Sequence, residues 1–374
     1  MKRHTCQPRV DWPERVSRVG LAHHSHESGP YWDESAFYEL SAADVANLEA
    51  AGQTLHALCL EAAEAVVEQG WWSRLGIPPA AAELAAESWE RDDFSVYGRF
   101  DLALTPDQPP RLLEYNADTP TGLIEASVAQ WFWLQDVDAA LDQFNSIHER
   151  LIEAWRRWNP ASPVHFAGVR DHVEDEQTVL YLRDTCEQAG ISTVPIFVDE
   201  IGWDAGSMRF VDLENRAIER CFKLYPWEWL CAEEFAPHLK PSGIRCVEPA
   251  WKMILSNKGL LPILWELFPD HPNLLAAFDD PSPLGASYVR KPRLGREGAN
   301  VTLVENGVAT TSLDGPYAQQ PAVYQAVAPL SLDGLHHPVF GLWMVDHEAA
   351  GVGIREDTSR ITNNLSRFVP HLIR

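Results

Sequence analysis

Two neighbouring stretches place charged and amide side chains where apolar strand residues are expected. Residues 95–104 read SVYGRFDLAL, residues 111–118 read RLLEYNAD, and the loop TPDQPP joins them. A short, proline-containing loop between two strand-like runs predicts a β-hairpin. Side chains alternate between the two faces of a strand, so a pairing of Leu104 with Arg111 fixes both faces. One face is then apolar, with Phe100 facing Tyr115 and Leu102 facing Leu113, and the other is polar, with Arg99 facing Asn116 and Asp101 facing Glu114.

The polar face predicts a metal site. Two carboxylates opposed across a hairpin repel each other unless a positive charge lies between them. Asp101, Glu114 and the carbonyl of Asn116 are hard oxygen donors, the kind that Mg²⁺ uses together with water and substrate phosphates. The alternative is a solvated sheet face in which Arg99 neutralises one acid. A helix expected to begin at Pro120, capped by Thr119, would add an anion-binding terminus beside the cation and so favours a phosphate or carboxylate substrate.

Two lysines and a glycine loop could bind a polyphosphate. Lys252 lies in the apolar stretch EPAWKMILSNKGLLPILWELFP, and Lys291 ends a strand that leads into a loop from Gly295 to Gly298. Flexible backbone can close over phosphates while ammonium groups neutralise their charge. Ordinary surface solvation of either lysine is the alternative. No P-loop motif occurs, and the strand end around Gln325 offers backbone groups for an adenine edge.

Composition limits the possible partners. The chain has 374 residues and a formal net charge of -24, which argues against nucleic-acid or anionic membrane partners, so basic groups must gather locally to hold an anion. No signal peptide or apolar run of membrane-spanning length is apparent, which predicts a cytoplasmic protein. Six scattered cysteines predict free thiols. His23, His24 and His26 in HHSH do not share one helical face, which favours a surface or packing role over a metal.

The helices and strands that must position the candidate site residues indicate a mixed α+β fold. A Ser-x-x-Asp capping box at Ser41 begins a long amphipathic helix that ends at Gly70, and an Ala-rich helix follows at 79–90. Residues 162–169, 174–190 and 192–198 read as strand, helix and strand, a βαβ unit with a parallel sheet. The last third predicts a largely antiparallel sheet. We expect three stretches, 1–160 with the metal-binding hairpin, 161–245 with the parallel sheet, and 246–374 with the lysines and the glycine loop.

Six segments together resemble a known family. They are YWDESAFYEL, YGRFD, LLEYNADTPT, WKMILSNKGLLPILWELFP, KPRLGREGANV and GIREDTSRITNNLSRFVPH, and in this order they resemble the synthetase part of glutathionylspermidine synthases and their stand-alone relatives. The resemblance implies a permuted ATP-grasp-like fold, an antiparallel sheet plus a small parallel pre-ATP-grasp subdomain, because the metal-binding acids precede the lysines. The amidase domain of bifunctional members is not matched, so no hydrolysis of a conjugate is expected.

The resemblance also implies roles for individual residues. The magnesium ligands are Asp101, Glu114 and Asn116, the catalytic arginines Arg99 and Arg355, the ATP-binding residues Lys252, Lys291, Gly295, Gly298 and Gln325, and the substrate-binding residues Thr119 and Thr121. The implied activity is an ATP-dependent and Mg²⁺-dependent ligation of a peptide or glutathione-like carboxylate to an amine or polyamine, through an acyl phosphate. The open alternatives are a catalytically silent Mg-ATP-binding sensor and a Mg²⁺-dependent phosphohydrolase.

Overall fold

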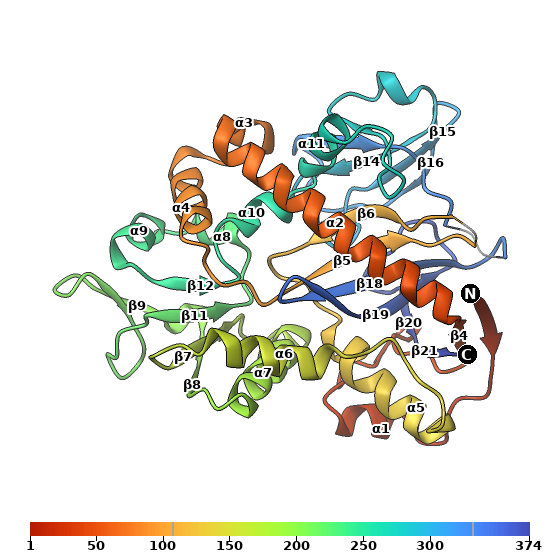
Figure 1. Cartoon of the computed structure of the whole chain (residues 1–374), viewed down its shortest axis with the longest axis horizontal. Helices are drawn as coiled ribbons and strands as arrows, with labels where there is room; N and C mark the ends of the chain where they lie inside the picture. Colours follow the sequence, from red (N-terminus) through yellow and green to blue (C-terminus); the bar gives the residue numbers. More distant parts are fainter. Residues whose placement is uncertain (107, 331–332) are drawn as a thin grey trace.

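The central sheet joins strands from the first and the last third of the chain (Figure 1). Its order is β20-β19-β18-β5-β6, and all neighbouring strands are antiparallel. The computed structural model describes residues 1–106, 108–330 and 333–374. It gives the five strands as β5 (Tyr97–Ala103), β6 (Arg111–Asn116), β18 (His337–Val345), β19 (Glu348–Asp357) and β20 (Arg367–Val369).

The predicted hairpin is present, but its register changes halfway. Arg99 pairs with Asn116, Phe100 with Tyr115 and Asp101 with Glu114, as predicted. A bulge after Asp101 then pairs Leu102 with Leu112 and Ala103 with Arg111, so the predicted pairs Leu102–Leu113 and Leu104–Arg111 are wrong. The extra residue is Leu113, which lines the same cavity as Glu114 instead of joining the apolar face. Residue 107 of the connecting loop lies outside the described residues.

A second antiparallel sheet is built from residues 277–325. Its order is β13-β17-β14-β15-β16, which confirms the predicted antiparallel arrangement there. The strands are β13 (Ala277–Phe278), β14 (Tyr288–Pro292), β15 (Thr302–Glu305), β16 (Val308–Ser312) and β17 (Ala322–Gln325). This sheet carries Lys291 on β14 and Gln325 at the end of the neighbouring β17, where Lys291 pairs with Val323 and Gln325 with Val289.

The middle of the chain forms the predicted parallel sheet. Its order is β12-β11-β7-β8, and helix α7 connects β7 to β8 as the βαβ unit requires. Its elements are β7 (Val164–Gly168), α7 (Val173–Gln188), β8 (Thr193–Phe197), β11 (Arg220–Lys223) and β12 (Arg245–Val247), with α6 (Ile147–Trp158) packed on α7. The hairpin β9 (Gly202–Asp204) and β10 (Arg209–Val211) and the short helices α8 (Trp227–Leu230) and α9 (Leu239–Ser242) complete this part. The division at 160 and 245 stays a prediction.

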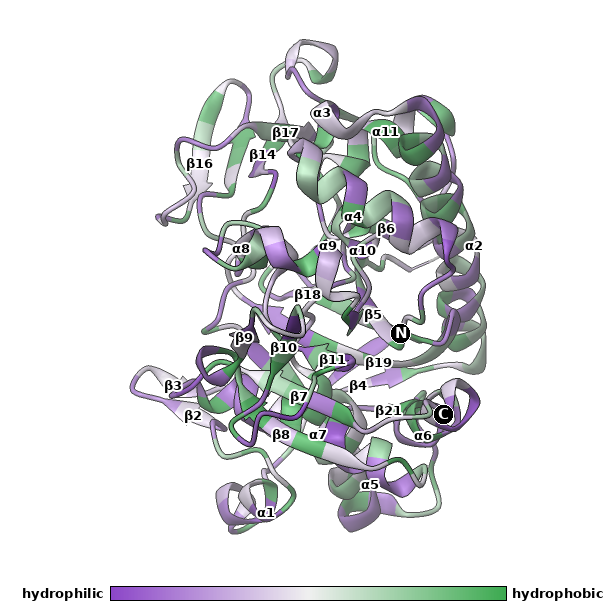
Figure 2. Ribbon diagram, turned by 90° about the vertical axis from the view of Figure 1, so that its left-hand side faces the viewer, coloured by the Kyte–Doolittle hydropathy of each residue, from purple (hydrophilic) through white to green (hydrophobic). Residues whose placement is uncertain are grey.

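Helix α2 (Ala42–Gln69) supports the central sheet from one side. Its predicted capping box is confirmed, because the Ser41 hydroxyl accepts from the Asp44 amide while the Asp44 carboxylate accepts from the Ser41 amide. Gly70 ends the helix with a left-handed backbone. Figure 2 shows α2 along one outer edge, with β5, β18 and β19 inside it. The neighbouring helices are α3 (Trp72–Leu75), the predicted Ala-rich α4 (Pro79–Glu90), α10 (Lys252–Leu255) and α11 (Leu260–Leu267).

Both ends of the chain pair with one strand. β4 (Ala36–Leu40) lies between β1 (Lys2–Thr5), which runs antiparallel to it, and β21 (His371–Ile373), which runs parallel. The first 140 residues also contain α1 (Trp12–Arg18), the hairpin β2 (Ser25–His26) and β3 (Gly29–Pro30), a π-helical turn η1 (Glu125–Ala129) and α5 (Gln130–Asp138). Within the described ranges, no helix has the length and apolar character needed to cross a bilayer.

Candidate active site

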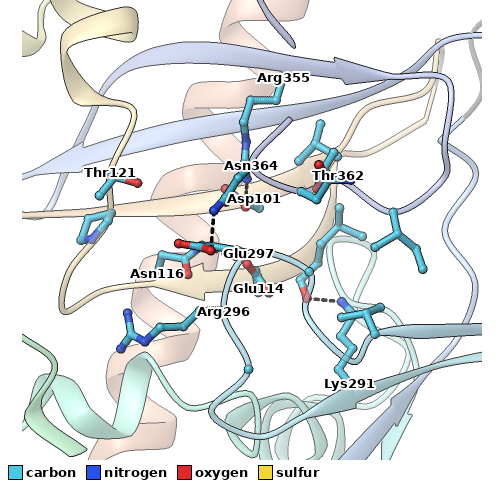
Figure 3. A pocket seen from close by; sticks show the side chains of 18 of the residues that line it. Asp101, Glu114, Asn116, Thr121, Lys291, Arg296, Glu297, Arg355, Thr362 and Asn364 are labelled. Atoms are coloured by element: carbon cyan, nitrogen blue, oxygen red, sulfur yellow. Dashed lines mark hydrogen bonds and ion pairs between the residues drawn. The ribbon is translucent and has the colours of Figure 1, made fainter. Parts of the chain in front are cut away.

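A cavity of about 330 Å³ brings most of the predicted residues together (Figure 3). Its lining comes from β5, β6, β14, β17 and β19 with their flanking segments, and also from the start of α7 and from α8. The described lining residues include six Lys and Arg but only five Asp and Glu, whereas the whole chain has 30 of the former and 54 of the latter. Basic groups are therefore concentrated in this cavity. Its charged lining residues are Arg99, Asp101, Glu114, Glu174, Asp175, Lys258, Lys291, Arg296, Glu297, Arg355 and Arg360.

The three predicted metal ligands lie together on the cavity wall. Asp101 and Glu114 are direct partners across the hairpin, and Asn116 follows on the same face of β6. The Asn116 amide nitrogen donates to Glu114 Oε1 over 3.1 Å, and its carbonyl oxygen has no hydrogen-bond partner within the described ranges. A free carbonyl oxygen beside two carboxylates on one face is a donor set that fits Mg²⁺.

Two arginines hold Asp101. Arg99 contacts both of its oxygens, with Nε 2.7 Å from Oδ1, and the Arg355 guanidinium lies 3.0 Å from Oδ2. Arg99 also donates to the Thr121 carbonyl over 2.5 Å. The stem of Arg99 lies against Gly341 of β18, where an added Cβ would stand only 2.9 Å from the arginine Cδ. The two predicted catalytic arginines thus converge on one carboxylate.

Lys291 and Gln325 form a buried pair beneath Glu114. The Lys291 ammonium donates to Gln325 Oε1 over 2.7 Å and to the Leu113 carbonyl over 2.9 Å. Burial lowers the pKa of Lys291 to about 8, although the charge of Glu114 opposes this shift. Gln325 in turn donates to the Leu112 carbonyl. The side chain of Gln325 therefore orients Lys291. The sequence had predicted only that backbone groups around Gln325 bind an adenine edge.

Lys252 does not line the cavity, so its predicted contact with ATP phosphates does not fit the structure. Its side chain points into the core, where Nζ lies 3.2 Å from Glu248 and donates to the Tyr97 and Ala117 carbonyls. Lys258, which the sequence argument missed, lines the cavity instead. Its Nζ lies 3.0 Å from Glu114 Oε2.

The positive charges of the two cavity lysines, Lys258 and Lys291, act on Glu114. Burial opposes ionisation, but Lys258 and Lys291 outweigh it and lower the pKa of Glu114. The signal for Lys258 was present in the sequence, since the polar triplet Asn257-Lys258-Gly259 interrupts an apolar stretch. Glu114 is thus ionised between two cations on one side of the cavity.

The glycine loop forms part of the cavity lining. Lys258 donates to the Gly295 carbonyl over 2.6 Å, and Arg296 donates to Thr119 Oγ1 over 2.8 Å and to Glu228 over 2.7 Å. Gly298 has a φ of +73°, and an added Cβ there would stand 2.3 Å from the Thr362 carbonyl oxygen. Only glycine fits this position without displacement of the loop.

The segment after β6 differs from the prediction. No helix begins at Pro120, and Thr119 is no N-cap, because helical structure starts at Leu123 and continues into the π-helical turn η1. The intervening Thr119 to Gly122 are irregular and line the cavity, including Thr121. Asp118 lies just before this irregular stretch. Its buried carboxylate accepts from Lys223 over 2.6 Å and from the Trp227 amide over 2.8 Å, which ties the hairpin to the parallel sheet.

An apolar region completes the cavity beside β17. Residues 326–328, which follow Gln325, line it together with other aliphatic residues. A flat ring can lie between such side chains while backbone groups bond its edge. The apolar side chains are Leu113, Val289, Leu303, Val327, Leu330 and Val339.

Comparison with solved structures gives the class of the fold. A glutathione synthetase-like effector from Globodera pallida superposes with a TM-score of 0.62, over 98% of this chain and 97% of that chain, at 7% sequence identity. The likeness at this identity shows the fold alone. The chain therefore has a glutathione synthetase-like fold of the ATP-grasp type, as predicted.

The chain belongs to the glutathionylspermidine synthase family, since the model "Glutathionylspermidine synthase preATP-grasp" matches residues 3–374. It is 38% identical to a Haemophilus influenzae protein named "Putative acid--amine ligase", covering 99% of both chains. It is 29% identical to the trypanothione synthetase of Crithidia fasciculata and 27% identical to the bifunctional glutathionylspermidine synthetase/amidase of Escherichia coli. The matches cover 53% and 60% of those two longer relatives.

Proposed function

We propose that this protein is an ATP-dependent carboxylate-amine ligase that forms an amide bond through an acyl phosphate. One observation carries the proposal: Asp101, Glu114 and Asn116 share a single cavity with two lysines and four arginines. Hard oxygen ligands beside several cations suit a metal-bound polyphosphate. The ligase names of the relatives agree with this reading.

Lys258 and Lys291 would contact the phosphates of ATP, and the apolar region beside 326–328 would hold its adenine. Asp101, Glu114 and Asn116 would hold Mg²⁺, which supplies charge neutralisation for the phosphoryl group when bound. In the first step a substrate carboxylate oxygen attacks the γ-phosphorus, and ADP leaves. In the second step an amine nitrogen attacks the acyl carbon, phosphate leaves, and the nitrogen loses a proton.

The arginines and the glycine loop would act on the acyl phosphate. Arg99 and Arg355 already lie within 3.1 Å of Asp101, so a small shift of either guanidinium brings positive charge to a phosphoryl oxygen. The loop from Gly295 to Gly298 lines the cavity, and when closed over the acyl phosphate it would exclude water that hydrolyses it.

The substrates would meet on the side of Thr119 and Thr121. Both threonines line the cavity beside the loop, where they would bind a peptide or glutathione-like acid. The carboxylates of Asp175 and Glu297 also line it and would attract a cationic amine or polyamine.

A screen of carboxylates against amines with Mg-ATP tests the function. We expect ADP release that requires both an acid and an amine, with mass spectrometry showing one amide formed for each ADP. Tight Mg-ATP binding without ADP release from any pair would identify a silent sensor. Phosphate release that needs no amine would identify a phosphohydrolase. Either result would overturn the ligase proposal.

A further inference from the structure

A second group of metal-ligand side chains lies beside the cavity, and one of its members lines it. His23 precedes β2, Glu125 begins the π-helical turn η1, and Glu174 lies in the first turn of α7. Their ligand atoms all lie within 4.8 Å of one another. The three residues are far apart in the sequence, so the fold has assembled them. Among them Glu174 lines the cavity, and Glu125 is almost completely buried behind it.

Neighbouring side chains orient the imidazole of His23. Its Nδ1 lies 2.9 Å from Gln177 Oε1, an oxygen that also accepts from the Ala22 amide. An amide oxygen only accepts, so Nδ1 donates its proton to Gln177. Nε2 then faces Glu125 Oε1, to which it donates when the ring is protonated, and in the neutral ring its lone pair is free for an ion. Metal-binding histidines are held in this way, with the second ring nitrogen donating to an oxygen. Tyr31 orients Glu125 by donating to its Oε1 over 2.7 Å.

The distances agree with a shared ion. Ligand atoms at about 2.0–2.1 Å from a tetrahedral ion lie about 3.3 Å apart, and His23 Nε2 lies 3.2 Å from Glu125 Oε1. Glu174 makes no hydrogen bond or ion pair with any described residue and is partly exposed, so it can turn toward the other two. A protonated His23 would balance only one of the two carboxylates, whereas a divalent ion balances both.

We propose that His23, Glu125 and Glu174 bind a divalent ion of the zinc or manganese type. An imidazole nitrogen with two carboxylates suits these ions, whereas the all-oxygen set around Asp101 suits Mg²⁺. The ion would join the N-terminal segment, η1 and α7, and so fix the parallel sheet against the central sheet at the cavity wall. His23 thus has a role beyond the surface or packing role predicted for HHSH. This proposal does not depend on ligation.

Calorimetric titration of the whole protein with zinc sulfate or manganese chloride tests this site. The protein is first stripped with a chelator and dialysed, and excess Mg²⁺ is present throughout to saturate the site at Asp101. We expect about one equivalent bound by the unmodified protein. His23→Gln and Glu174→Gln should each weaken binding at least tenfold, and Gln177→Leu about tenfold because the ring loses its orientation.

Two control variants separate binding from folding. His24→Gln changes the adjacent histidine and Asp184→Asn changes another acid of α7, and both should bind the ion as the unmodified protein does. Circular dichroism should show all variants folded. Absence of binding by the unmodified protein, or equal binding by His23→Gln and Glu174→Gln, would overturn the proposal. So would binding of 1,4-diaminobutane that these two variants abolish while no metal is retained, because the cluster would then be an ammonium site.

Discussion

Methionine substitutions at Lys258 and Lys252 separate phosphate binding from folding. Lys258→Met removes an ammonium that lies in the cavity 3.0 Å from Glu114. The loss of one charge-assisted hydrogen bond to a phosphate costs about 1.5–3 kcal/mol, so Mg-ATP affinity should fall about 10- to 150-fold. Lys252→Met instead leaves Glu248, with 0% exposure, without its ion-pair partner 3.2 Å away. Breaking such a buried pair costs about 3–5 kcal/mol of the free energy of unfolding.

Calorimetry with Mg-ATP and urea unfolding measure the two effects on the same preparations. Lys258→Met should bind ATP weakly and unfold near the midpoint of the unmodified protein, because Glu114 keeps Asn116 and solvent as partners. Lys252→Met should unfold at much lower urea but, where folded, bind ATP with nearly unchanged affinity. The reverse pattern, with ATP affinity lost in Lys252→Met alone, would refute the assignment of the phosphate contact to Lys258.

Three further changes probe the same cavity. Asp101→Asn leaves both arginines without their acid, and ADP release with a substrate pair should fall at least about 100-fold; a wild-type rate would contradict its role. Because Lys291 has a pKa of about 8 and binds phosphate only when protonated, Mg-ATP affinity should fall as pH rises through 8; titrations at constant ionic strength that show no such fall would exclude this lysine. Gly298→Ala places a Cβ 2.3 Å from the Thr362 oxygen, so the loop should shift, proteolysis there should quicken and ligation should slow at least tenfold; unchanged cleavage and rate would refute the steric argument.

Local patterns predicted the two hairpin strands, the helix capped by Ser41 and the βαβ unit, but only one half of the hairpin register. Alternation with period two is enough to place Arg99, Asp101, Glu114 and Asn116 on one face, because the pleat imposes it. The bulge at Leu113 depends on how the hairpin twists against its neighbours, and nothing in the residue types marks it. The capping box at Ser41 was predictable because, unlike the bulge, it does not depend on packing: its contacts join residues only three positions apart.

Residues brought together by tertiary packing were less accessible to sequence reasoning. Lys252 and Lys258 lie six positions apart in one apolar stretch, and only the packing of α10 decides that the first points into the core. The start of the helix after β6 was misplaced because Pro120 suits a first helical turn as well as an irregular segment. His23 could not be linked with Glu125 and Glu174, because three distant segments must fold before these side chains meet.

Gly341 shows how a position without a functional group can control the chemistry of a site. Because Gly341 has no side chain, it leaves space that the aliphatic stem of Arg99 occupies. A saturation-mutagenesis survey scored by activity would therefore mark this position as essential, even though it contacts the cavity only through its neighbour. Searches for active sites that consider only reactive side chains would pass over it. In a redesign of this cavity, Gly341 should be kept fixed together with the arginine that it accommodates.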